Sequence, residues 1–291
     1  MILHEFPRRF AELRTALQLR YEAGEASEIA KRLLEHVTGV ARKDWQLHPD
    51  KEWNPAWTPD LEKDQQKLLE GIPIQHVIGY AEFYGRKFQV NEAVLIPRME
   101  TEELVHWILA DESDQSHVSF LDIGTGSGCI GLSLAAAWGD RQMSFTAHAM
   151  DVSEAALTVA KTNAKSLSAP MRWHLTSVFE APPSLFGNLD LIVSNPPYVT
   201  LEEKTQMSPL VLDYDPELAL FAPPEDALAF YRIIAERAKD WLRPGGRLYV
   251  EINEAFGSET AELLQEMGFS KVELRKDLNG RDRMVRAYFL G

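Results

Sequence analysis

Asn195, Pro196, Pro197 and Tyr198 directly follow the apolar run "LDLIVS", and their types suit the handling of a nitrogen atom. Two consecutive prolines remove two backbone donors and restrict two φ angles, so the apolar run must end here in a stiff corner. The side-chain oxygen of Asn195 and the backbone oxygen of Pro196 can each accept one N–H of a planar NH₂ group. Tyr198 offers a flat apolar face against which an amide or a base can lie. We therefore expect the corner to orient an amide or an exocyclic amine.

Such a corner suits methyl transfer to nitrogen. An amide or exocyclic amine nitrogen is a weak nucleophile because its lone pair is delocalised, and in-line attack on a methyl group requires that pair to be aimed. Acceptors on both N–H bonds orient the nitrogen and favour its more tetrahedral form in the transition state. No general base is required before transfer, because the nitrogen becomes cationic as a sulfonium donor loses its charge. Asn195, Pro196 and Tyr198 are therefore candidate catalytic residues.

A glycine-rich loop, "DIGTGSGCIG", places Gly124, Gly126 and Gly128 between an apolar strand pattern and a helical pattern. A backbone without Cβ atoms can turn tightly there and let a ligand approach the helix N-terminus. Asp151 ends the next strand pattern, and its carboxylate can accept hydrogen bonds from both hydroxyls of a ribose. The combination fits NAD as well as an adenosine-containing methyl donor. Asp151 could instead cap the helix that begins in "DVSEAAL".

The elements that must position these residues alternate in type after residue 117. We interpret seven segments as strands: 118–124, 145–151, 171–177, 189–195, 247–253, 271–276 and 283–290. Helical patterns follow Ser127 and cover 153–167, 226–242 and 258–267. This alternation predicts an α/β fold with a largely parallel sheet and helices on both faces. Ligands in such folds bind at the carboxyl ends of the strands, where the glycine loop and the corner both lie.

The N-terminal part of the chain reads as helices. Apolar residues recur at helical spacing in 6–17 and 29–37, and "TPDLEKDQQKLLEG" predicts a third helix with Thr58 as its cap. Trp45, Trp53 and Trp57 are expected to pack in this helical domain. The segment "YAEFYGRKFQVNEAVLIP" alternates aromatic and polar residues around a turn-like Tyr84-Gly85-Arg86, which predicts a hairpin.

The length, net charge and cysteine content of the chain exclude several classes of protein. The 291 residues favour two domains, and the net charge of −14 argues against bulk binding to nucleic acid. The segment "RKDLNGRDRMVR" is one candidate basic patch, and it can also be a solvated strand and turn. The single cysteine, Cys129, excludes an internal disulfide and a multi-cysteine metal site, and no metal is expected. With no signal peptide or membrane-length apolar run in the sequence, a cytoplasmic protein is expected.

Taken together, these motifs resemble the HemK/PrmC family of methyltransferases. The likeness covers nearly the whole chain and includes "PIQHVIGYAEFYGRKFQVNEAVLIPRMETEEL", "DIGTGSG", "MDVSEAAL", "SNPPYV", "DYDPELALF", "RPGGRLYVEI" and "KDLNGRDRMV". The segment "VLIPRMETE" is the most specific of these, because it links the two domains in this family and is absent from generic methyltransferases.

The resemblance implies a seven-stranded, mostly parallel, Rossmann-like methyltransferase sheet preceded by a small α-helical domain. The expected domains are a helical substrate-recognition domain at 1–75, a β-hairpin linker at 76–98 and a methyltransferase domain at 99–291. The implied reaction methylates, with S-adenosyl-L-methionine, the side-chain amide of the glutamine in the Gly-Gly-Gln motif of class I peptide chain release factors. A monomer without a membrane or nucleic-acid partner is expected.

Residue by residue, the resemblance assigns the corner to the acceptor glutamine and Asp151 to the donor's ribose. Other donor contacts are expected from Asn195, Val178 and the glycine loop, namely Gly124, Thr125, Gly126, Ser127 and Gly128. The chain departs from the family at Ser177-Val178-Phe179, where an Asp and an aromatic residue are usual beside the adenine. It also departs at Phe256, where a glutamine is usual. Neither change is expected to touch the transfer site.

Three other functions remain open from the sequence. A methyltransferase acting on the amino group of adenine in DNA or RNA needs the same geometry at its acceptor nitrogen, although it should carry a basic recognition region. A nicotinamide-dependent oxidoreductase would use the glycine loop but leave the corner unexplained. A non-catalytic adaptor that binds release factors is also compatible with the sequence.

Overall fold

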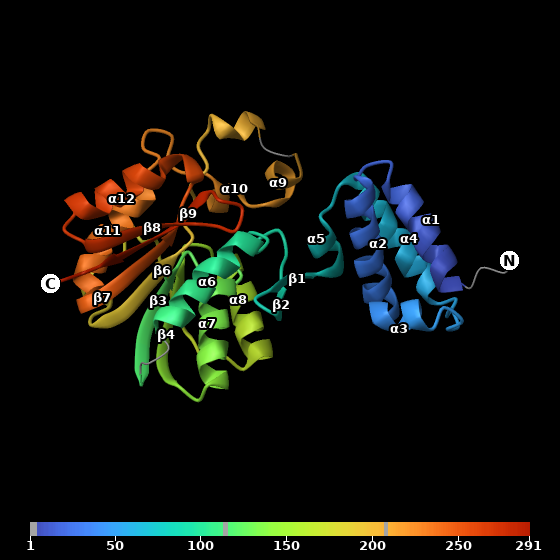
Figure 1. Ribbon diagram of the computed structural model, residues 1–291, viewed down its shortest axis with the longest axis horizontal. Helices are drawn as coiled ribbons and strands as arrows, with labels where there is room; N and C mark the ends of the chain where they lie inside the picture. The colour runs from blue at the N-terminus through green and yellow to red at the C-terminus, as the bar shows by residue number, and fades with distance from the viewer. Residues whose placement is uncertain (1–4, 113–115, 207–208) are drawn as a thin grey trace. The chain divides into compact units, whose positions relative to one another are not determined.

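The computed structural model describes residues 5–112, 116–206 and 209–291. The chain divides into two compact units, Met1–Tyr80 and Ala81–Gly291 (Figure 1). Among the described residues, no helix combines the length and the apolar character needed to cross a membrane.

The first unit consists of helices, as predicted. They are α1 (Glu5–Leu17), α2 (Ala23–Thr38), α3 (Arg42–Leu47), α4 (Trp57–Glu70) and α5 (Ile74–Ile78). Gly39 ends α2 in a left-handed conformation with φ of 66°. The prediction that Thr58 caps the third helix was wrong: α4 already begins at Trp57, and the Thr58 hydroxyl accepts a hydrogen bond from the Trp53 indole at 3.1 Å.

An aromatic cluster fills the core of the first unit. The Phe6 ring lies 6.3 Å from Trp45, 5.3 Å from Trp53 and 5.9 Å from Trp57, measured between ring centroids. Edge-to-face contacts dominate, the geometry that aromatic quadrupoles favour. The three tryptophans are therefore packing residues, as expected.

The predicted hairpin is formed by β1 (Tyr80–Phe83) and β2 (Arg86–Gln89), which belong to the second unit apart from Tyr80. Its two-residue turn has positive φ at Tyr84 (48°) and Gly85 (70°), as a tight hairpin turn requires. After the hairpin, Val90, Val94 and Ile96 pack with Ala81 against Ala156 and Val159 of α8 (Glu154–Leu167). Most of the expected linker thus forms part of the second unit.

Seven strands among the described residues form one sheet in the order β5-β4-β3-β6-β7-β9-β8. They are β3 (His117–Ile123), β4 (Ser144–Asp151), β5 (Arg172–Leu175), β6 (Leu189–Ser194), β7 (Leu242–Glu251), β8 (Ser270–Lys276) and β9 (Asp282–Tyr288). The pairings from β5 to β7 are parallel, and β9 runs antiparallel to both of its neighbours. The predicted fold class is confirmed.

Helices cover both faces of the sheet (Figure 1). One hydrophobic cluster joins the sheet to α11 (Ala229–Trp241) and α12 (Gly257–Glu266), and another joins it to α6 (Met99–Asp111) and α7 (Cys129–Asp140). Two short helices, α9 (Pro209–Tyr214) and α10 (Glu217–Leu220), lie between β6 and α11 in the chain. Single 3-10 turns occur at Pro183–Leu185, Glu203–Gln206 and Glu254–Phe256.

The strand register brings the chemistry-bearing residues to one edge. Ile123 at the end of β3 pairs with both Met150 of β4 and Ser194 of β6, and Ser194 in turn pairs with Val250 of β7. The residues that come next in each strand are therefore aligned in a row: Gly124, Asp151, Asn195 and Glu251. The strand order reverses between β3 and β6, which is where ligands bind in open parallel sheets.

Candidate functional site

A cavity of about 310 Å³ opens at this sheet edge. Its walls include the glycine loop, Asp151, residues 176–179 after β5 and the corner from Asn195 to Pro197. Segments that lie far apart in the sequence therefore line one cavity, as the strand pattern predicted. The predicted donor and acceptor residues lie together because the carboxyl ends of parallel strands share an edge.

The glycine loop is held open by backbone hydrogen bonds and by a buried acid. Gly124 and Gly126 have φ of 68° and 54°, and the Gly124 N–H donates to the carbonyl of Met150 at 2.9 Å. Asp122, at the end of β3, accepts hydrogen bonds from the Thr125 hydroxyl (2.7 Å) and the Gly131 N–H (3.0 Å). Burial raises the pKa of Asp122 to about 7.

Asp151 braces the loop and does not cap a helix. Its two oxygens accept the N–H groups of Gly126 and Ser153, each at 2.9 Å, while the hydroxyl of Ser153 caps α8 by accepting from Ala156. The alternative reading of Asp151 as the helix cap was therefore wrong. The pKa of Asp151 is raised, because burial outweighs the hydrogen bonds from Ser153 and Gly126 that lower it.

Gly128 is the one glycine of the predicted set that does not line the cavity. It precedes α7 with φ of 82°, and a Cβ atom there would lie 2.7 Å from the Leu132 Cδ1 atom. Its contribution is close packing of the loop against the helix. Thr125 and Ser127 are buried beside it.

The corner also borders a second cavity, of about 270 Å³. Both cavities are lined by Asn195 and Pro196, together with Leu95, Arg98 and Ala219. The Asn195 side-chain nitrogen donates to the Thr101 hydroxyl oxygen at 3.4 Å, so the amide carbonyl oxygen is left as an acceptor. Because the two cavities share Asn195 and Pro196, a group bound in one cavity can contact a group bound in the other at the corner.

Tyr198 lines the second cavity and is fixed by contacts on both sides. Its hydroxyl donates to Glu251 at 3.2 Å, and its backbone carbonyl accepts from the Asn253 side chain at 3.1 Å. Burial raises the pKa of Tyr198 well above its ordinary value. Tyr198 is therefore a neutral wall of the cavity and not a proton acceptor.

Sequence reasoning missed an ion pair at Arg98, a residue that lines both cavities. The Arg98 guanidinium pairs with Asp215 at 2.6 Å, and Asp215 also accepts the Ile96 N–H at 3.2 Å. The Asp215 side chain is only 3% exposed, so this pair joins "VLIPRMETE" firmly to "DYDPELALF". Both segments are among the motifs that resemble the family. They lie more than a hundred residues apart in the sequence, so no local pattern predicts their contact.

The two departures from the family pattern lie in different places. Ser177, Val178 and Phe179 line the first cavity, and the Ser177 hydroxyl accepts the Phe179 N–H at 3.2 Å. Phe256 lines neither cavity, and its carbonyl accepts from Thr260 at 2.7 Å.

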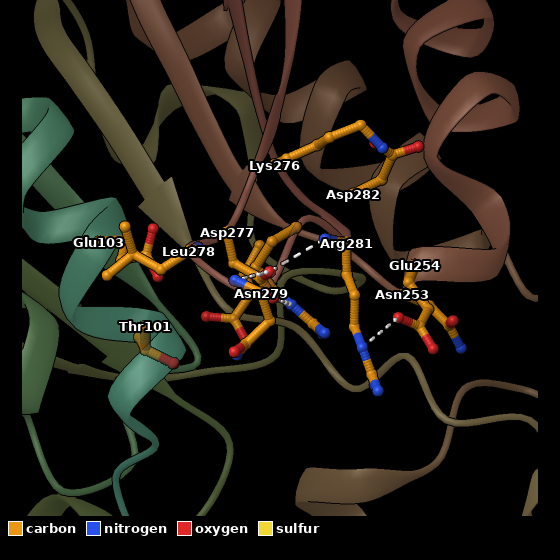
Figure 2. A network of polar contacts seen from close by, with 12 residues as sticks. Thr101, Glu103, Asn253, Glu254, Lys276, Asp277, Leu278, Asn279, Arg281 and Asp282 are labelled. Carbon is orange, nitrogen blue, oxygen red and sulfur yellow. Dashed lines mark hydrogen bonds and ion pairs between the residues drawn. The ribbon is translucent and has the colours of Figure 1, made fainter.

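The candidate basic patch is neutralised by acids. Every basic side chain from Arg275 to Arg286 forms an ion pair: Arg275–Glu273, Lys276–Asp282, Arg281–Glu254, Arg283–Asp277 and Arg286–Asp111. Figure 2 shows the turn between β8 and β9, where the Arg281 side chain reaches Glu254. These contacts favour the interpretation of "RKDLNGRDRMVR" as a solvated strand and turn over its interpretation as a basic patch.

Comparisons with known proteins agree with this geometry. Residues 101–210 match the Methyltransferase small domain family, and residues 11–79 match the PrmC N-terminal domain family. The hMettl16 catalytic domain, solved in complex with the MAT2A 3'UTR hairpin 6, aligns with a TM-score of 0.54 and 19% identity over 71% of this chain and 76% of that chain. At that identity the likeness concerns the fold alone.

Similarity to whole relatives is closer. The release factor glutamine methyltransferase of Bacteroides thetaiotaomicron is 42% identical over 95% of this chain and 98% of the relative. The protein of the same name from Flavobacterium psychrophilum is 38% identical over 99% of this chain and 100% of the relative. With the paired cavities and the corner between them, this similarity over the full length shows that the chain belongs to the release factor glutamine methyltransferase family.

Proposed function

We propose that this protein transfers the methyl group of S-adenosylmethionine to the side-chain amide nitrogen of the glutamine in the Gly-Gly-Gln motif of class I release factors. The observation that carries the proposal is the meeting of two cavities at Asn195 and Pro196. The names of the full-length relatives support the choice of acceptor.

The first cavity fits the methyl donor. Each Asp151 oxygen accepts one backbone N–H, and a carboxylate has about four acceptor positions, so Asp151 can still accept from two ribose hydroxyls. Gly124, Thr125, Gly126 and Ser127 would surround the methionine part, with Val178 beside the adenine and Asn195 near the sulfonium. When bound, S-adenosylmethionine supplies an electrophilic methyl group.

The second cavity would receive the glutamine side chain. Asn195 and Pro196 would accept the two N–H groups of its amide, Pro197 would keep the corner rigid, and Tyr198 would pack against the amide plane. These acceptors turn the nitrogen lone pair toward the donor cavity and favour the transition state over the ground state. Arg98, paired with Asp215, would restrict entry to a narrow side chain on a flexible loop such as Gly-Gly-Gln.

Recognition of the release factor is assigned, within this proposal, to the helical domain at 1–75, with 99–291 carrying the chemistry and 76–98 connecting them. We propose that the protein acts as a monomer.

A direct assay tests the proposal. Purified protein with labelled S-adenosylmethionine should add one methyl group to the Gly-Gly-Gln glutamine of a release factor, as located by mass spectrometry. Replacement of that glutamine by alanine should abolish labelling. Labelling of adenine in DNA or RNA with an unmodified release factor would favour the nucleic-acid methyltransferase instead. Calorimetric binding of NADH without binding of S-adenosylmethionine would contradict both.

A further inference from the structure

Asn253 is a buried residue next to the corner that has no part in the reaction as proposed above. It lies shortly after the end of β7 and is 5% exposed. Its side-chain oxygen accepts the N–H of Ala255 at 2.9 Å. Its side-chain nitrogen donates to the carbonyl of Tyr198 at 3.1 Å and to the two Glu203 oxygens at 3.0 and 2.9 Å. The contacts of Asn253 therefore lead to the corner and to the segment that follows it.

These contacts fix which way the Asn253 amide points. An amide nitrogen can only donate hydrogen bonds, and an amide oxygen can only accept them. A flipped amide would place its oxygen against three acceptor oxygens and its NH₂ group against the Ala255 N–H. Of the two orientations, only the one in the structure satisfies every partner, with the nitrogen toward Tyr198 and Glu203.

Glu203 fastens the segment that follows the corner. Its Oε2 atom accepts from the backbone N–H of Thr200 (2.8 Å) and from the Thr200 hydroxyl (2.9 Å). The Glu203 N–H donates back to the Thr200 hydroxyl oxygen at 3.3 Å, and this reciprocal pair closes residues 200–203 into a compact turn. Partial burial of the carboxyl group opposes its ionisation, but hydrogen bonds from Thr200 and Asn253 outweigh burial and lower the pKa of Glu203. Glu203 is therefore a charged acceptor that joins this turn to Asn253.

A second attachment of the segment lies around α10. The Val199 N–H donates to the Leu220 carbonyl at 2.9 Å, and the Val199 carbonyl accepts from the Ala222 N–H at 3.0 Å. Tyr198, Val199 and Leu220 all line the second cavity. One wall of that cavity is thus fastened at two places, and Asn253 ties its backbone to the end of β7.

We propose that Asn253 and Glu203 are positioning residues that hold the cavity wall formed by Tyr198 and Val199 in the form that binds the acceptor glutamine. Neither Asn253 nor Glu203 lines a cavity, so they act through the backbone of Tyr198 and Thr200. The inference rests on the proposed function for its effect on KM, whereas the state of the segment can be measured without a release factor.

Two single substitutions each reverse one polar group with little change in shape. Asn253→Asp keeps the acceptor for the Ala255 N–H, but its second oxygen faces the Glu203 carboxylate. Glu203→Gln keeps an acceptor for Thr200, but its NH₂ group faces the NH₂ group of Asn253. Each variant should raise KM for the release factor by roughly 5- to 100-fold, with a smaller effect on kcat, because a buried polar group loses its partner. Unchanged KM in both variants would overturn the positioning role.

Matched controls make the same chemical changes elsewhere. Asn91→Asp is the control for Asn253→Asp, because the exposed Asn91 side chain also accepts the N–H two residues further on, that of Ala93, at 3.0 Å. Glu202→Gln removes the same charge from the exposed neighbour of Glu203. Both controls should keep KM close to the wild-type value. An equal rise of KM in Glu202→Gln and Glu203→Gln would mean that charge alone matters, and would remove Glu203 from the proposal.

The double variant Asn253→Asp/Glu203→Gln exchanges donor and acceptor. The new amide at position 203 can donate to the new carboxylate at position 253, so one hydrogen bond returns and the net charge stays that of the wild type. KM should therefore fall below that of either single variant. Recovery should be incomplete, because the carboxylate still faces the Tyr198 carbonyl. Losses that add in the double variant would contradict a direct pairing of Asn253 with Glu203.

Hydrogen exchange keeps this inference separate from the proposed function. Without donor or release factor, mass spectrometry of peptides covering 198–206 should show faster exchange in each single variant and restored protection in the double variant. This pattern, in a protein whose wild type fails to methylate release factor, would refute the proposed function alone. Unchanged exchange in the single variants of an active enzyme would refute the positioning role alone. Faster exchange with unchanged KM would also refute it, because the segment would then move without affecting the cavity.

Discussion

Asp151 combines two roles, bracing the glycine loop and offering acceptors to the donor cavity. Asp151→Ala removes acceptors that the ribose hydroxyls would need, so the free energy of S-adenosylmethionine binding should weaken by about 1.5–3 kcal/mol. Isothermal titration calorimetry measures this directly. Asp151→Asn is the comparison, because it keeps one carbonyl acceptor and should lose less. Unchanged affinity with a lower melting temperature would mean that Asp151 only braces the loop.

Asn195 and Tyr198 should respond differently to truncation, because they contribute at different stages. Asn195→Ala removes an acceptor that acts most strongly in the transition state, and it should cost about 3 kcal/mol in kcat with donor affinity largely intact. Tyr198→Ala removes a binding face, so KM for the release factor should rise with a smaller effect on kcat. Steady-state kinetics with varied release factor distinguishes the two. A pure KM effect in Asn195→Ala would contradict its assignment to catalysis.

At the scale of elements, the loop between β3 and α7 divides its glycines between packing and ligand contact. A Cβ atom at Gly128 would press on Leu132, whereas at Gly126 nothing lies within 4 Å. Gly128→Ala should therefore lower the free energy of unfolding by about 1–3 kcal/mol and leave donor affinity near that of the wild type.

Gly126→Ala should likewise cost about 1–2 kcal/mol through backbone strain, but it should also cause a clear loss of donor affinity, because Gly126 lines the cavity. Chemical denaturation and calorimetry on both variants give the comparison. Equal loss of affinity in the two would show that the loop responds as a unit.

Helix α6 was missed in the sequence analysis although its pattern is helical. Its buried residues include Leu104, Val105, Trp107, Ile108 and Leu109, which form one broad face opposite Glu102, His106 and Ala110. The sequence analysis assigned this segment to no helix because it treated "VLIPRMETE" as a link between domains. Thr101, which contacts Asn195, went unnoticed with it.

For the whole molecule, buried titratable groups make stability depend on pH in opposing directions. Asp122 has its pKa raised by burial from 3.8 to about 7, so the folded state holds the proton more tightly and stability falls as pH rises between these values. Burial and the charges of His174 and Arg172 lower the pKa of His148 from 6.5 to about 4, so its contribution rises with pH over that window. The two trends partly cancel in the wild type.

Asp122→Asn should therefore gain stability relative to the wild type as pH rises from about 4 to about 7. The slope of this difference should be at most about 1.4 kcal/mol per pH unit and should vanish above pH ~7. Urea denaturation at several pH values measures it. A difference that is constant across the range would mean that Asp122 does not titrate in this window.

The sequence by itself determined the features that depend on short-range sterics and periodicity. Pro196 and Pro197 end a strand wherever they occur, alternating patterns marked the strands from β3 to β9, and the glycine spacing marked the loop. The corner, the loop and Asp151 could thus be named as a site because parallel strands present their carboxyl ends at one edge.

The tertiary structure decided which of these residues contact each other and which hydrogen-bond partners hold them. Asp151 braces the loop because the Gly126 N–H lies within hydrogen-bond distance, which the sequence does not show. Likewise, Asn195 contacts Thr101 and Tyr198 contacts Glu251, and both partners come from other elements. The strand order and register that align Asn195 with Glu251 arise from burying both faces of the sheet at once. No local pattern encodes that result, because it minimises the free energy of the whole second unit and of no single segment.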